Sequence, residues 1–126
     1  MIDALTNLLL ISIGGALGAS TRYWVTSKAK YIKFLPLGTL IVNTVGSFLL
    51  GFFLTLSTYY IVETGYILLI GTGFLGSFTT MSTFVIETLS FKDVAPRLAF
   101  TNFILMILFV LLGVILGNTL GVVMAH

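Results

Sequence analysis

Residues 73–87 of the chain read GFLGSFTTMSTFVIE, and apolar residues flank this stretch on both sides. Its two glycines, five hydroxyls and single carboxylate are unusual inside a membrane segment, because lipid offers no hydrogen-bond partner to a polar group. Glycine, serine and threonine are also weak helix formers. We therefore expect a membrane helix that is broken at its middle, where backbone carbonyls become free to bind a small hard cation such as Na⁺.

The composition is that of an integral membrane protein. Of 126 residues, 58% are hydrophobic, and only six are Lys or Arg and four Asp or Glu. Four apolar runs, at about residues 5–25, 35–60, 66–91 and 98–123, reach the length of about 20 residues that crosses the hydrocarbon of a bilayer. They use nearly the whole chain. We therefore predict an all-α membrane protein with one domain, residues 1–126, of four transmembrane helices.

Several classes of function are excluded by what the chain lacks. It has no Cys and a single His, which excludes disulfides, thiolate metal sites and a histidine cluster. Its net charge of +2 reflects a basic membrane flank and not a surface for nucleic acid. No set of nucleophile and base is visible, so we do not expect an enzyme.

Polar residues in the second apolar run favour a lined path through the membrane. Asn43 lies inside this run, and Thr39 and Ser47 fall four residues to either side of it, on the same helical face. An amide inside a membrane span can also join two helices. Both interpretations of Asn43 stay open from the sequence.

Beyond the expected break, Thr80, Thr83, Phe84 and Glu87 follow the spacing of one helix face. Hydroxyls donate hydrogen bonds, and an aromatic ring has a positive edge. This lining suits a small, strongly hydrated anion. Arg22, near the end of the first run, either reaches the membrane interface or attracts anions into a vestibule.

Three motifs carry a resemblance to a known family. They are GGALGASTRY (residues 14–23), GTLIVNTVGSFLLG (38–51) and GFLGSFTTMSTF (73–84). With these motifs the chain resembles the Fluc (CrcB) family of fluoride channels over all four spans. The resemblance implies an antiparallel dimer with two fluoride pores and a structural Na⁺ on its two-fold axis. It implies that backbone carbonyls of Gly76 and Thr79 from each subunit hold this Na⁺, and that Arg22 corresponds to the arginine of the family motif.

The fluoride path is predicted from the residue pattern and the resemblance together. The pore asparagine of the family corresponds to Asn43, and its two pore phenylalanines correspond to positions 81 and 84. We expect the path to be lined by Thr39, Asn43, Ser47, Thr80, Met81, Ser82, Thr83, Phe84 and Asn102.

Two features depart from the family pattern. Met81 stands where the family usually has phenylalanine, and a thioether has no ring edge. In the fourth run, Asn102 is followed at helical spacing by Met106 and Val110, where the family usually has serines. One wall of the path is therefore expected to be poor in hydrogen-bond donors.

All six Lys and Arg residues flank the first and third connections between spans. They are Arg22, Lys28, Lys30, Lys33, Lys92 and Arg97. Because the placement of Lys and Arg sets orientation, we expect these connections in the cytoplasm and both termini outside. In an antiparallel dimer the partner is then either the same chain inserted the other way or an oppositely oriented paralogue. Both remain open.

We predict a fluoride-selective channel that lets fluoride leave the cell passively through the cell membrane, in contact with lipid and without nucleic acid. One alternative is a small four-span multidrug exporter, but this needs a membrane-embedded carboxylate, usually in the first span. The only acid there is Asp3, outside the hydrocarbon. The other alternative is a poorly conducting partner subunit of a heterodimeric fluoride channel, which Met81 and the hydroxyl-poor fourth run favour.

Overall fold

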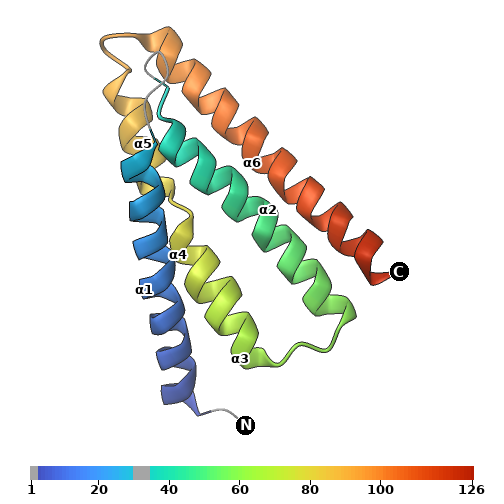
Figure 1. Cartoon of the computed structure of the whole chain (residues 1–126). Coiled ribbons are helices and arrows are strands. Elements are labelled where there is room, and N and C mark those ends of the chain that lie inside the picture. Colours follow the sequence, from blue (N-terminus) through green and yellow to red (C-terminus); the bar gives the residue numbers. More distant parts are fainter. Residues whose placement is uncertain (1–2, 30–34) are drawn as a thin grey trace.

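Four helical stretches long and apolar enough to cross a membrane make up most of the molecule (Figure 1). The computed structural model describes residues 3–29 and 35–126. The stretches are Ala4–Lys28, Leu37–Tyr59, Thr64–Ser90 and Pro96–Ala125. The prediction of four membrane-spanning helices is confirmed, with ends that differ from the predicted ones by a few residues. The basic residues Lys30 and Lys33 lie outside the described residues.

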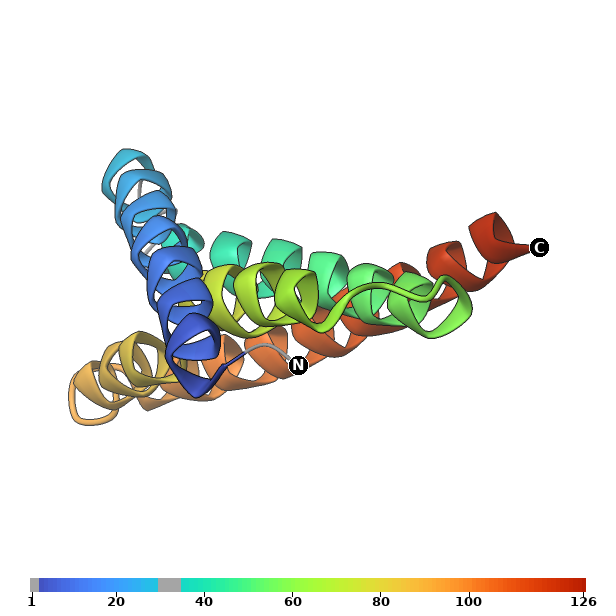
Figure 2. The ribbon, with the colours of Figure 1, turned by 90° about the horizontal axis from the view of Figure 1, so that it is seen from below.

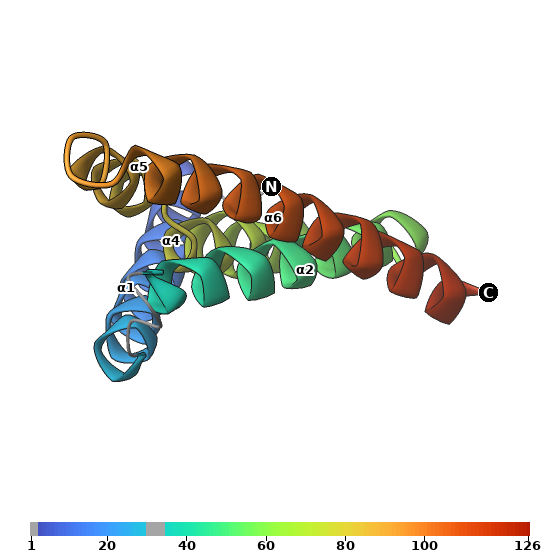
Figure 3. The same ribbon diagram turned by 90° about the horizontal axis from the view of Figure 1, so that it is seen from above.

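Three of the spans are continuous helices: α1 (Ala4–Lys28), α2 (Leu37–Tyr59) and α6 (Pro96–Ala125). Pro96 lies in the first turn of α6, where the N–H that proline lacks has no helical partner. The 30 residues of α6 give a helix about 45 Å long. Figures 2 and 3 show that its C-terminal half projects away from α1.

The third span consists of several helical segments. In chain order they are α3 (Thr64–Tyr66), η1 (Ile67–Leu75), α4 (Gly76–Phe78) and α5 (Met81–Ser90). The segment η1 is a π-helix, a rare form that is frequent near functional sites. The apolar pattern does not predict it, because every residue of this segment except Thr72 is apolar or glycine, so no periodicity distinguishes one helix type from another.

The spans pack in two pairs that meet at the third span. The helix α2 lies along α6, while α1 lies against η1 and α4. Both contacts bring backbones together at glycines. A Cβ atom at Gly18 would collide with the backbone carbonyl of Phe74, and one at Gly117 with that of Phe48. Small residues therefore set how closely these membrane helices approach.

Few apolar side chains are buried inside the protomer. The buried ones are Val42, Leu75, Phe78, Phe84 and Met106. They come from α2, η1, α4, α5 and α6. Most other large apolar side chains, such as Leu17 and Leu116, are exposed, as expected of faces that contact lipid. Among the residues that the structure describes, the buried apolar side chains thus concentrate around the α4–α5 junction inside the third span.

The ends of the molecule differ in charge. The end of α1 and the α5–α6 connection are both at the upper end in Figure 1, whereas the start of α1 and α3 are both at the lower end. The upper segments contain Lys28, Lys92 and Arg97 with one acid, Asp93, and the lower ones contain Asp3 and Glu63. Among the residues that the structure describes, the basic side chains at the span ends therefore gather on one side.

Candidate functional site

The backbone leaves the helical conformation between α4 and α5. Thr79 (φ −79°, ψ 159°) and Thr80 (φ −148°, ψ 123°) are both extended. Thr80 then caps α5, because its side-chain oxygen accepts a hydrogen bond from the Thr83 N–H at 3.3 Å. Threonine is a favourable residue at this position. The sequence Thr79-Thr80 thus ends one helix and begins the next.

Asn43, from α2, binds both polar groups of the extended residue Thr80. Its Oδ1 accepts from the Thr80 N–H at 2.7 Å, and its Nδ2 donates to the Thr80 carbonyl at 2.9 Å. Both residues are buried. An unpaired backbone group is costly in a membrane, so the Asn43 carbonyl gives the Thr80 N–H the acceptor that it no longer has in a helix.

Two carbonyls beside this junction are of interest for a cation. The Thr80 N–H, which would bond to the Gly76 carbonyl in a continuous helix, donates to Asn43 instead. Within the described residues, the Gly76 oxygen keeps only a 3.5 Å contact from the Thr79 hydroxyl. The Thr79 carbonyl accepts from Arg22 Nη1 at 3.1 Å. Hard cations prefer such oxygen ligands, and the Gly76 carbonyl is the freer of the two.

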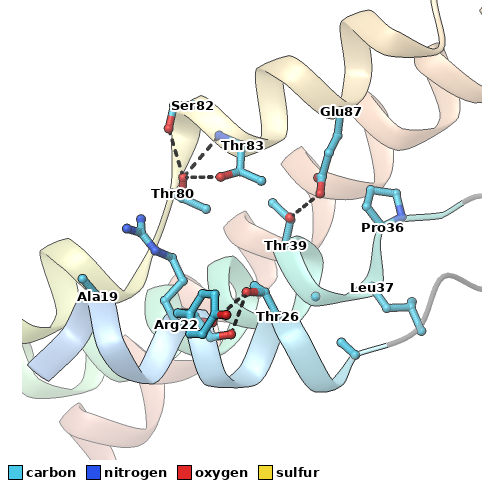
Figure 4. A pocket seen from close by; sticks show the side chains of 13 residues that line it. Ala19, Arg22, Thr26, Pro36, Leu37, Thr39, Thr80, Ser82, Thr83 and Glu87 are labelled. Carbon is cyan, nitrogen blue, oxygen red and sulfur yellow. Dashed lines mark hydrogen bonds between the residues drawn. The ribbon is translucent and has the colours of Figure 1, made fainter.

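A cavity of about 390 Å³ opens beside the junction, between α1, α2 and α5 (Figure 4). Thr80 Oγ1 lies at the centre of a hydroxyl cluster, 3.1 Å from Thr83 Oγ1 and 3.3 Å from Ser82 Oγ. The polar side chains that line the cavity are those of Arg22, Tyr23, Thr26, Thr39, Thr80, Ser82, Thr83 and Glu87. Six residues with hydroxyl groups and one guanidinium thus line the cavity, which makes it rich in hydrogen-bond donors.

Arg22 and Glu87 are the two ionisable groups of this first cavity apart from the Tyr23 phenol. Arg22 extends from α1 toward Thr80 (Figure 4). Glu87 Oε1 accepts from Thr39 Oγ1 at 2.8 Å, while Oε2 is buried and without a partner among the described residues. The cavity can therefore attract an anion to its Arg22 side and accept hydrogen bonds at its Glu87 side.

A second cavity, of about 250 Å³, shares Thr80 with the first. Its lining is mostly apolar and includes Leu50, Met81, Phe84, Met106, Ile107 and Val110, with the polar Asn43, Ser47, Thr79 and Thr80. The sulfur of Met106 accepts from Asn43 Nδ2 at 3.5 Å. The Phe84 ring stacks on Phe103, with 6.1 Å between the ring centroids. This cavity is poorer in donors than the first.

The structure divides the residues of the predicted path between the two cavities. Thr39, Ser82 and Thr83 line the first, whereas Asn43, Ser47, Met81 and Phe84 line the second, and Thr80 lines both. Thr39 shares a helical face with Asn43 and Ser47, but its hydroxyl donates a hydrogen bond to Glu87, which lines the first cavity. Asn102 lines neither cavity. It is buried, and its Nδ2 donates to Thr88 Oγ1 at 2.8 Å.

Two residues of the site were not among the predicted path residues. Glu87 was expected on the face of Thr80 and Thr83, but its bond to Thr39 connects residues 48 positions apart, which no local pattern reveals. For Met106, the sequence predicted only the lack of a hydroxyl at a position where the family usually has serine. Its sulfur accepts a hydrogen bond from Asn43, which lies in a different span. Both interactions depend on how the helices pack.

These features define a small, multi-pass helical membrane protein with two cavities that meet at one buried threonine inside its third span. A family model described as "CrcB-like protein, Camphor Resistance (CrcB)" matches residues 9–118. The chain therefore belongs to the CrcB family, as the three motifs indicated.

Curated relatives with the same printed name cover most of the chain. The protein "Fluoride-specific ion channel FluC" of Thermosipho melanesiensis is 43% identical over 119 residues, which are 91% of this chain and 95% of the relative. The one of Pyrococcus abyssi is 39% identical over 118 residues, 92% of this chain and 95% of the relative. The one of Legionella pneumophila is 53% identical over 85 residues, 64% of this chain and 63% of the relative.

Proposed function

We propose that this chain forms a fluoride-selective channel through which fluoride leaves the cell passively across the cell membrane. The observation that carries the proposal is the similarity, over 91% of the chain at 43% identity, to a protein named as a fluoride-specific ion channel. The donor-rich lining of the first cavity supports it. A small anion with tightly held water needs closely spaced donors in exchange for that water.

The proposed path runs from the first cavity to the second. Arg22 attracts the anion to the first cavity, where the hydroxyls of Thr80, Ser82 and Thr83 donate to it. Thr80 belongs to both linings. In the second cavity the anion meets the Ser47 hydroxyl and the Phe84 ring, whose edge is weakly positive.

We further propose an antiparallel dimer with a structural Na⁺ between the subunits, held by the carbonyls of Gly76 and Thr79. The residues present fit such a cation, since the Gly76 oxygen has lost its helical donor to Asn43. Gly76 is also exposed, and a Cβ there would meet only the Gly71 carbonyl, at 3.7 Å. This side of the protomer is open to a partner. Arg22 already donates a hydrogen bond to the Thr79 carbonyl, so the Thr79 oxygen would have to bind both Arg22 and Na⁺.

One observation favours a second candidate function, that of a poorly conducting subunit beside an oppositely oriented paralogue. The wall that α6 contributes to the second cavity consists of Met106, Ile107 and Val110, without a hydroxyl. The basic residues at one end support a fixed orientation in the membrane. This candidate and the homodimeric channel differ in what the chain does alone.

The proposed function is tested with the purified chain alone in liposomes. Liposomes loaded with potassium fluoride should release fluoride when the protein is present and a potassium ionophore balances the charge, as recorded with a fluoride electrode. Matched liposomes loaded with potassium chloride should stay full. Equal release of both anions would contradict fluoride selectivity. No release by the chain alone, followed by release once the paralogue is added, would support the partner-subunit candidate instead.

A further inference from the structure

The amide of Asn43 has no free N–H in this structure. An asparagine side chain carries two N–H donors and one carbonyl acceptor. One N–H donates to the Thr80 carbonyl at 2.9 Å and the other is directed to Met106 Sδ at 3.5 Å. The carbonyl accepts from the Thr80 N–H at 2.7 Å. An anion in the second cavity can therefore bind Asn43 only by displacing one of these partners.

The three contacts of Asn43 differ in strength. Two of them join the amide to the Thr80 peptide. One of these pairs the buried Thr80 N–H, which has no helical acceptor, so its loss would leave a buried backbone group unpaired. The third is a long contact to a thioether, which is a weak acceptor. The Met106 contact is therefore the one that an anion would replace.

Met106 is placed to be that replaceable partner. It is 3% exposed and lines the same cavity as Asn43, Ser47 and Phe84. Its side chain is unbranched and flexible, so the sulfur can move aside within a cavity of about 250 Å³. A hydrogen bond to an ionised acceptor is roughly twice as strong as one between neutral groups, which favours the anion over the sulfur.

We propose that Met106 determines how readily fluoride binds in the second cavity. Its sulfur accepts a hydrogen bond from the Asn43 amide nitrogen, and fluoride must replace the sulfur as the acceptor. This inference rests on the proposed fluoride path. It assigns Met106 a role in specificity, since an anion that accepts hydrogen bonds weakly gains too little to displace the thioether. Asn43 keeps its two bonds to Thr80 throughout.

The test replaces the sulfur and keeps the volume. Met106→Leu removes the acceptor with little change in packing, so one N–H of Asn43 loses its competitor. In the liposome assay the fluoride concentration that gives half-maximal efflux should fall by about two- to fivefold, the range expected when a weak hydrogen bond no longer competes. Met124→Leu is the matched control, because the Met124 side chain is 59% exposed near the end of α6. This control should match the unchanged protein.

A spectroscopic readout separates competition from packing. The chain contains four asparagines, so protein labelled with ¹⁵N-asparagine shows four side-chain NH₂ groups by NMR. Fluoride should shift one proton of the Asn43 NH₂ group more than the other. Met106→Leu should shift that same proton without fluoride, whereas Met124→Leu should not.

The outcomes distinguish this inference from the proposed function. If the unchanged chain releases fluoride and Met106→Leu has the half-maximal concentration of the Met124→Leu control, Met106 only fills space and the inference is wrong. The same conclusion follows if fluoride shifts both Asn43 protons equally or neither. If the unchanged chain and both variants release no fluoride and bind none, the proposed function is wrong, and the role of Met106 fails with it.

Discussion

At the scale of single residues, two buried asparagines differ in the kind of acceptor to which their side-chain amides donate. Asn43 and Asn102 are 7% and 2% exposed. Asn102 donates to the Thr88 hydroxyl at 2.8 Å, whereas Asn43 donates to the Thr80 carbonyl at 2.9 Å. A hydroxyl can turn and become the donor, but a carbonyl can only accept. The two sites should therefore respond differently to the same substitution.

We expect Asn43→Asp to destabilise the protein more than Asn102→Asp does. Each variant buries a carboxyl, but only at position 43 does it face a peptide carbonyl with no proton to share. The difference should be about 1–3 kcal/mol, the usual cost of an unsatisfied buried group. Thermal unfolding of both purified variants in the same detergent measures it.

The Asn43→Asp variant should also lose fluoride efflux, because a carboxylate in the second cavity repels the anion. Size-exclusion chromatography must first show the same assembly as for the unchanged protein. Equal loss of stability in the two variants would mean that the contact between Asn43 and the Thr80 carbonyl contributes little. Normal efflux through a correctly assembled Asn43→Asp protein would remove Asn43 from the path.

At the scale of elements, the contact between α1 and the third span depends on backbone approach. A Cβ at Gly18 would collide with the carbonyl of Phe74, an atom that cannot move without moving its helix. At Gly15, in the same helix, the nearest atom to a new Cβ is the Ser77 hydroxyl oxygen at 3.2 Å, which can rotate away. This contact holds α1, and with it Arg22, beside the junction of α4 and α5.

We expect Gly18→Ala to lower stability by about 1–3 kcal/mol, the cost of overpacking a close contact. Gly15→Ala is the control and should change stability little, since alanine also favours the helix over glycine. Urea or thermal unfolding of the two variants measures the difference. Similar stabilities would show that α1 is not held by this backbone contact.

At the scale of the whole molecule, the freer of the two carbonyls beside the α4–α5 junction belongs to an exposed glycine, Gly76. Gly76 is exposed, and its Cβ position lies in nearly open space. In the proposed dimer this surface meets its counterpart from the partner around Na⁺. A ligand that binds only the assembled state stabilises that state in proportion to the logarithm of its concentration.

The fraction of dimer should therefore depend on Na⁺. When Na⁺ is replaced by K⁺ or by N-methylglucamine throughout purification, we expect less dimer in size-exclusion chromatography and less fluoride efflux, with recovery once Na⁺ returns. Gly76→Ala should lower the dimer fraction while the protomer stays folded. A dimer fraction that is the same with and without Na⁺ would argue against a structural cation at these carbonyls.

Features that depend on local composition could be predicted from the sequence alone. The four spans follow from apolar runs long enough to cross a bilayer, and three motifs were sufficient to indicate the family. Weak helix formers and a capping threonine occur together near the middle of the third apolar run, where Thr79 and Thr80 are extended.

The pairing of polar groups could not be predicted from the sequence, because it depends on how the helices pack. The bonds of Asn43 to Thr80, of Thr39 to Glu87 and of Asn43 to Met106 join residues 37, 48 and 63 positions apart. Residue spacing predicts which side chains share a helical face, and it places Thr39, Asn43 and Ser47 on one face of α2. Packing separates them, since each turn of α2 meets a different part of the third span or α6. Hydrogen bonds act over about 3 Å, so the hydrogen-bond partners follow from the approach of whole helices.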